Sequence, residues 1–133
     1  PTPPTSSPKG KNDGYTIDSV VAGSFHSTPR GEAFIAEQIF EEGYLHGSVS
    51  HLVKSPLSLI SEWANDVRIA ELPIGKFAFL DTETSGLAGG TGTFAFLVGV
   101  GRFVGQDFQL VQFFMRDPFE EPARLLALEG LLR

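Results

Sequence analysis

Apolar residues concentrate in the second half of the chain, and their spacing predicts strands there. Residues 76–81, 93–103 and 107–116 are rich in phenylalanine and β-branched side chains, a composition that sheets bury. Residues 104–106 form so short a connection that the second and third segments must pair as an antiparallel hairpin. The first segment is expected to be a buried strand that runs into an acidic residue.

Spacings of three and four between apolar positions predict two helices. One begins at Ser55-Pro56 and ends before Pro73, with a capping hydroxyl followed by proline at the first helical position. We expect its apolar face, Trp63 included, to be part of the core and to cover a sheet. The other helix spans residues 123–132 and follows acidic and proline start signals at 120–122.

The first half of the chain is less regular. Residues 32–40 fit strand alternation about as well as they fit a helix, but flanking glycines bracket a run of strand-like length, which favours a strand. Residues 1–14 contain no side chain that can pack and are expected to be a disordered lead-in. The sequence thus divides into this lead-in, an accessory strand and helix segment over 15–75, and an α/β unit over 76–133.

Composition and charge narrow the function. Ten Lys and Arg against sixteen Asp and Glu give a formal net charge of −6, which argues against a broad basic surface for nucleic acid. It does not argue against a nuclease, whose carboxylates hold metal ions. The absence of cysteine excludes disulfides and thiolate zinc sites. With no signal-peptide pattern and no apolar run near the ~20 residues of a membrane helix, a soluble cytoplasmic protein is expected.

Candidate chemistry lies at the end of the first predicted strand. Side chains alternate across a strand, so Asp81 and Glu83 should share a face, roughly 6 to 7 Å apart along it. Two carboxylates at the end of an apolar strand repel each other unless a cation lies between them. Hard oxygen ligands at this spacing suit Mg²⁺ or Mn²⁺, so the pair resembles half of a two-metal phosphoryl-transfer site.

The bare pair is weak evidence, because six Asp and ten Glu give about 0.4 Asp-x-Glu pairs by chance. Taken alone, the pair is better explained as a solvated strand end than as a metal site. Its context, an apolar strand followed by Asp-x-Glu-Thr-x-Gly-Leu and the glycine-rich run 86–92, is more specific. That run lacks the Gly-Lys-Ser/Thr ending of a phosphate loop. It is expected to form a tight loop that lets a substrate backbone approach the site.

Other features have simpler structural interpretations. The glycines at 99, 101 and 105 lie in or at the end of a predicted strand, where a dinucleotide fingerprint cannot operate, and are expected to allow close packing. His46 and His51 are expected to be turn residues or partly buried histidines rather than zinc ligands. Arg102 and Arg116 end the two hairpin strands; they are expected to be solvated, with phosphate contact as the alternative.

The motif DTETSGL (residues 81–87) resembles the first motif of the DnaQ-like (DEDD) 3′–5′ exonucleases, which share a ribonuclease H-like fold. The longer stretch over 76–133 is similar to the bacterial YprB-type ribonuclease H-like domain. Residues 28–47 also resemble the region that precedes that domain, which again favours a strand there. The resemblance implies a mixed α/β sheet, of which this chain holds an antiparallel three-strand portion and the first helix.

The resemblance also implies roles for residues of the motif. Asp81 would bind both of two divalent cations, Mg²⁺ or Mn²⁺, and Glu83 the one that activates water. The backbone around Thr84 would contact the terminal nucleotide, and the side chain of Leu87 would pack against a base. Ser85 and Gly86 lie between them in the motif; threonine is commoner in the family at the position of Ser85. The implied substrate is the 3′ end of single-stranded DNA or RNA.

Four carboxylates form a DEDD site, and here the resemblance covers only the first two. The others, with a His or Tyr, would follow the helix at 123–132, so we expect a domain truncated at Arg133. The remaining acidic residues, at 107, 117, 120 and 121, are expected in a hairpin turn and at helix starts.

We therefore expect these 133 residues alone to expose an apolar edge at 76–81, to fold poorly and to lack nuclease activity. A cooperative thermal transition of the monomer, with slow amide exchange over 76–81, would contradict this. The alternative function is a non-catalytic module that binds nucleic acid or protein and retains the fold; a cofactor-binding α/β domain is a weaker third.

Overall fold

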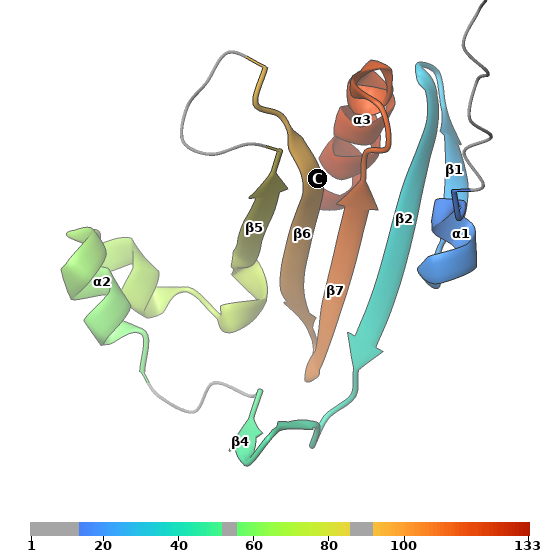
Figure 1. Ribbon diagram of the computed structural model, residues 1–133. Coiled ribbons are helices and arrows are strands. Elements are labelled where there is room, and N and C mark those ends of the chain that lie inside the picture. The colour runs from blue at the N-terminus through green and yellow to red at the C-terminus, as the bar shows by residue number, and fades with distance from the viewer. Residues whose placement is uncertain (1–13, 52–55, 86–91) are drawn as a thin grey trace, which may run out of the picture.

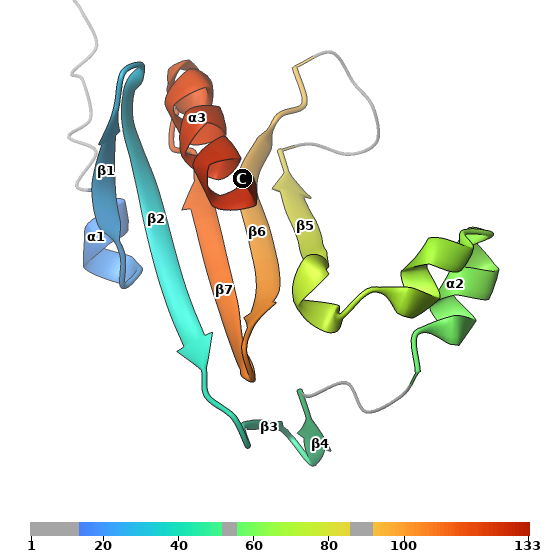
Figure 2. The same cartoon turned by 180° about the vertical axis from the view of Figure 1, so that it is seen from behind.

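The computed structural model describes residues 14–51, 56–85 and 92–133. Five antiparallel strands form one sheet in the order β1-β2-β7-β6-β5, with a helix, α3, on one face (Figures 1 and 2). The strands are β1 (Ser24–Thr28), β2 (Gly31–Phe40), β5 (Ala78–Thr84), β6 (Ala95–Val104) and β7 (Asp107–Phe114); α3 is Glu121–Leu132. This α/β architecture agrees with the predicted fold class, and two strands from the first half of the chain extend the predicted three-strand portion.

Short elements connect these strands. They are α1 (Ile17–Val20), the paired β3 (Leu45–His46) and β4 (Val49–Ser50), α2 (Ser58–Ala64) and the 3₁₀ turns η1 (Val67–Glu71), η2 (Ile74–Lys76) and η3 (Pro118–Glu120). Among the described residues, no helix has the length and apolar character needed to cross a lipid bilayer.

The main core lies between the sheet and α3. Strands β6 and β7 contribute Val98, Val100, Val111 and Phe113, which are almost fully buried. Against them pack Ala127, Leu128 and Leu131 of α3, spaced three and four apart on one helix face. One face of the sheet is therefore closed, and residues of the alternate register point to the opposite face.

The predicted hairpin and the strand in the first half of the chain are both confirmed. Val104 pairs with Asp107 across a two-residue turn, and Gly105 has a φ of +65°, which a glycine adopts without strain. Strand β2 pairs with β7 over seven residues, so residues 31–40 form a strand and not a helix. Residues 1–13, most of the predicted lead-in, lie outside the described residues.

The prediction for the first helix is wrong in its length and its packing. Helix α2 has only seven residues, because Asn65 adopts a left-handed conformation (φ +52°) and the chain continues as the 3₁₀ turn η1. Its N-cap is Leu57, and Ser55 lies outside the described residues. The helix lies beyond β5 instead of on a sheet face (Figure 1), and Trp63 is 77% exposed, not part of the core.

The prediction of a buried strand at 76–81 is also wrong in part. The strand exists as β5, but it begins at Ala78 and all of its residues are exposed. Strand β5 is the outermost strand on its side of the described sheet, so it has only β6 as a hydrogen-bonded neighbour. Phe79 and Leu80 are 46% and 63% exposed, consistent with the apolar edge expected from the sequence.

The start of α3 is fixed by acidic residues in structural roles, as predicted. Asp117 caps η3 by accepting a hydrogen bond from the backbone N–H of Phe119. Glu120 accepts hydrogen bonds from the backbone N–H of Arg116 (2.9 Å) and from its guanidinium. Asp107 accepts the N–H of Glu42, which joins the end of β2 to the hairpin.

The Arg116–Glu120 pair predicts a pH-dependent contribution to stability. Burial alone would raise the pKa of Glu120, but hydrogen bonds from Arg116 outweigh it and hold the pKa below its ordinary value of 4.5. The pair therefore stabilises the fold fully above the unfolded-state pKa and stops doing so as the pH falls through the folded-state pKa. Glu120→Gln should lower the free energy of unfolding by about 1 kcal/mol at neutral pH.

Urea denaturation at neutral pH and near pH 3 measures this effect. The difference between wild type and Glu120→Gln should shrink as the pH falls and the wild-type carboxyl becomes protonated. Glu129→Gln is the matched control, because Glu129 makes an exposed pair with Arg133 on the same helix and should matter little at either pH. An equal Glu120→Gln effect at both pH values would contradict the assignment.

Candidate functional site

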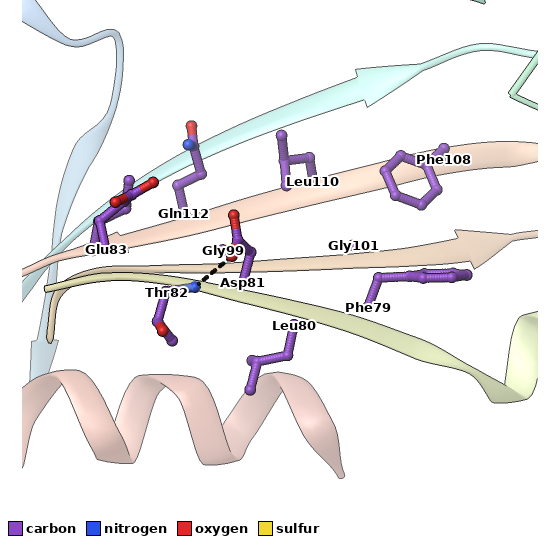
Figure 3. A pocket seen from close by; sticks show the side chains of 11 residues that line it. Phe79, Leu80, Asp81, Thr82, Glu83, Gly99, Gly101, Phe108, Leu110 and Gln112 are labelled. Carbon is purple, nitrogen blue, oxygen red and sulfur yellow. Dashed lines mark hydrogen bonds between the residues drawn. The ribbon is translucent and has the colours of Figure 1, made fainter. Parts of the chain in front are cut away.

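The carboxylates of Asp81 and Glu83 lie on the open face of the sheet. Figure 3 shows both side chains pointing to the same side of β5, while Leu80 and Thr82 point to the side of α3. The shared face, predicted from strand alternation, is thus present in the structure. Phe79 extends the same row toward the start of the strand.

A groove of about 350 Å³ runs along these side chains. Its floor is formed by two glycines of β6: Gly99 is paired with Asp81, and Gly101 with Phe79. Since glycine has no side chain, the sheet is open at Gly99, whereas the ring of Phe108 lies over Gly101. Residues of β7 form the far wall: Phe108, Leu110 and Gln112.

The negative charge in this groove is uncompensated by any cation in the described part of the chain. Oδ1 of Asp81 accepts a hydrogen bond from the backbone N–H of Thr82 at 2.9 Å, which orients that carboxylate. None of the ion pairs found among the described residues includes Asp81 or Glu83. Two carboxylates on one face, without a Lys or Arg partner, have the donor chemistry that a hard divalent cation requires.

The described residues contain no group of three or more His, Asp or Glu side chains that could together hold a metal ion. Within residues 14–51, 56–85 and 92–133, Asp81 and Glu83 would therefore be a partial set of ligands. The side-chain amide of Gln112 faces the same groove (Figure 3).

The strand end that follows Glu83 is irregular. Glu83 pairs with Leu97, but Thr84 pairs with Ala95, so Phe96 is an extra residue on β6 and forms a β-bulge. Beyond it, the N–H of Ser85 donates to the carbonyl of Phe94 at 2.9 Å. Thr84 and Ser85 are thereby placed directly after the carboxylate pair; their predicted contact with substrate stays a prediction.

Two predicted site residues, Gly86 and Leu87, lie outside the described residues, as does most of the glycine-rich run. The floor and far wall of the groove were not identified from the sequence; they are formed by Gly99, Gly101, Phe108, Leu110 and Gln112. The sequence shows only that the glycines at 99 and 101 share one strand face. Only the register between β5, β6 and β7 shows that this face adjoins Asp81.

The arginines singled out in the sequence have structural partners, so neither is simply solvated. Arg102 lies between the sheet and α3 and donates to Gln109 (2.7 Å) and to the carbonyl of Leu131 (2.9 Å). Arg116 contacts Glu120 and lies over the ring of Phe25, 4.7 Å from its centroid. Neither residue lines the groove.

His51 is a partly buried histidine with structural contacts, as predicted. The ring nitrogens of His51 lie 3.1 Å and 3.2 Å from the carbonyl oxygens of Tyr44 and Gln106. The ring also stacks on Phe103. His51 therefore links the β3–β4 segment to the β6–β7 turn.

Comparison with known proteins gives one family similarity, and it covers the segment that carries the two carboxylates. Residues 78–132 match the family model described as RNase_H superfamily. The match begins with β5 and ends with α3, so this part of the chain, which includes Asp81 and Glu83, is similar to that superfamily. No match was found among curated proteins or among solved structures.

The two floor glycines give a test of the groove. A Cβ added at Gly101 would lie 2.3 Å from Cζ of Phe108, whereas at Gly99 the nearest atom would be 4.0 Å away. Gly101→Ala must therefore displace the Phe108 ring and should lower the free energy of unfolding by about 1–3 kcal/mol. Gly99→Ala fits and should leave stability unchanged or raise it by about 0.5 kcal/mol. Urea denaturation distinguishes the two, and equal effects would contradict this packing.

Proposed function

We propose that the ribonuclease H-like part of this chain belongs to a metal-dependent nuclease that hydrolyses phosphodiester bonds, with Asp81 and Glu83 as metal ligands. The observation that supports this most directly is the uncompensated carboxylate pair on the open face of β5, inside the range that matches the family. The YprB-type, DnaQ-like identity and 3′–5′ polarity rest on the resemblance of DTETSGL to the first DEDD motif.

The residues present fit such a metal site in part. Both carboxylates supply hard oxygen atoms, and the Thr82 N–H holds Asp81 in one orientation. Two Mg²⁺ or Mn²⁺ ions, when bound, would supply a nucleophile at neutral pH and stabilise charge on the phosphate. Because the described residues contain no third suitable side chain in this cluster, the proposed site needs ligands from outside them.

The remaining groove residues would serve the substrate. The glycine floor leaves room beside Asp81, so a nucleotide backbone can approach the carboxylates without meeting side chains. Thr84 and Ser85, and beyond them Gly86 and Leu87, would contact the terminal nucleotide at the 3′ end of a single strand. Since Arg102 and Arg116 are in structural contacts, we propose that bound metal, more than these arginines, attracts the phosphate.

A second candidate is a module that retains the fold and binds nucleic acid or protein without cleaving it. Its support is the absence of a third metal-holding side chain beside the pair in the described residues. In that case, the carboxylates would simply be an exposed strand end. The two candidates differ in whether divalent metal binds at Asp81 and Glu83.

Asp81→Asn and Glu83→Gln test the nuclease proposal in the full-length protein. Each variant should reduce Mn²⁺-dependent cleavage of a 5′-labelled single-stranded oligonucleotide more than about 100-fold, because each removes a ligand charge. Glu37→Gln is the matched control: Glu37 is a strand glutamate on the opposite face of the sheet, bound by Gln109, and should leave the rate unchanged.

Calorimetric titration with Mn²⁺ alone provides a readout besides activity and should show binding to wild type that both site variants weaken. Products shortened stepwise from the 3′ end indicate exonuclease action, and DNA and RNA strands of one sequence compare the substrates. Oligonucleotide binding without cleavage, unaffected by either substitution, would overturn the nuclease proposal in favour of the binding module.

A further inference from the structure

Arg124 is a buried charge on the first turns of α3. Its side chain is only 3% exposed, while the other arginines that form ion pairs in the described residues are 43% to 83% exposed. Burying a guanidinium is costly unless it is well paired. A leucine or methionine at this position would fill the helix–sheet interface without that cost, so the arginine needs another explanation.

The contacts of Arg124 offset little of this cost. Nη2 lies 3.9 Å from the nearest oxygen of Glu121, whose own side chain is 54% exposed. Nε has no hydrogen-bond partner among the described residues. The close contact is a hydrogen bond from Nη1 to the backbone carbonyl of Ala95.

That carbonyl belongs to the β-bulge at the end of the candidate site. Three successive carbonyls at this point accept hydrogen bonds from three different elements: Phe94 from the Ser85 N–H, Ala95 from Arg124, and Phe96 from the Met115 N–H. Ala95 is also the residue paired with Thr84, directly after the register shift that follows Glu83. Arg124 is therefore linked to the strand end that carries the proposed chemistry through a single hydrogen bond to Ala95, the residue paired with Thr84.

We propose that Arg124 is a positioning residue for this site. By holding the Ala95 carbonyl from the helix side, it fixes the bulge, and the bulge sets where Glu83, Thr84 and Ser85 stand relative to β6. This inference rests on the proposed nuclease function for its effect on activity, but its structural part can be measured separately. Displacements of about 1 Å at a reacting centre reduce rates as much as 100-fold.

The test uses Arg124→Met and Arg124→Lys in the full-length protein. Arg124→Met keeps the apolar packing but removes the hydrogen-bond donor. Amide exchange at Ser85 and Met115, followed by NMR, should therefore accelerate at least about tenfold. The kcat with Mn²⁺ should fall roughly 10- to 100-fold, with KM nearly unchanged. Arg124→Lys retains a donor and should restore part of both. The melting temperature of each variant shows whether the fold is retained.

Arg102→Met is the matched control, because Arg102 also joins the sheet to α3 through a backbone carbonyl, at the other end of β6. It should leave Ser85 exchange and kcat unchanged. Unchanged Ser85 and Met115 exchange in Arg124→Met, or an equal change in Arg102→Met, overturns the proposal. If Arg124→Met does not fold, Arg124→Lys is compared with Arg124→Gln instead. Equal amide exchange at Ser85 and Met115 in these two variants would then overturn the proposal.

The two proposals fail in different ways. A wild-type protein without metal-dependent cleavage would reject the nuclease function, and the exchange measurements would still decide whether Arg124 holds the bulge. Active wild type with a fully active Arg124→Met variant would reject the positioning role alone.

Discussion

The packing of α3 against one face of the sheet is the constraint on which the candidate site depends. It buries the alternate residues of β6 and β7, such as Val100 and Phe113, and leaves the other register facing outward. Asp81 and Glu83 belong to that outward register on β5. Had the strand been shifted by one residue, the carboxylates would point toward the apolar core, where their charge would be strongly unfavourable.

Features governed by local chemistry were predictable from the sequence. The turn at Gly105 and the alternation around it predict the β6–β7 hairpin, and the acidic start signals predict α3. Strand alternation also predicts the common face of Asp81 and Glu83. The groove beside them was not predictable, because its floor at Gly99 becomes adjacent to Asp81 only through the pairing of separate strands.

The errors have a common physical origin. Apolar spacing identifies which side of an element is apolar but not what lies against it, so Trp63 was expected in a core and is exposed. In the same way, the composition of β5 does not distinguish a central strand from an outer one. Arg124 is the converse case: an arginine near a helix start is ordinarily solvated, and only the three-dimensional packing reveals that it is buried.

The pairing of β2 with β7 has a consequence for the order of folding. Phe34 pairs with Phe114, so these strands are joined by a long intervening chain, whereas β6 and β7 are joined by a two-residue turn. Closing the long loop costs more conformational entropy, and contacts of high sequence separation form slowly. During synthesis the β1–β2 hairpin is made first, and its inner edge remains without a partner until β7 has emerged.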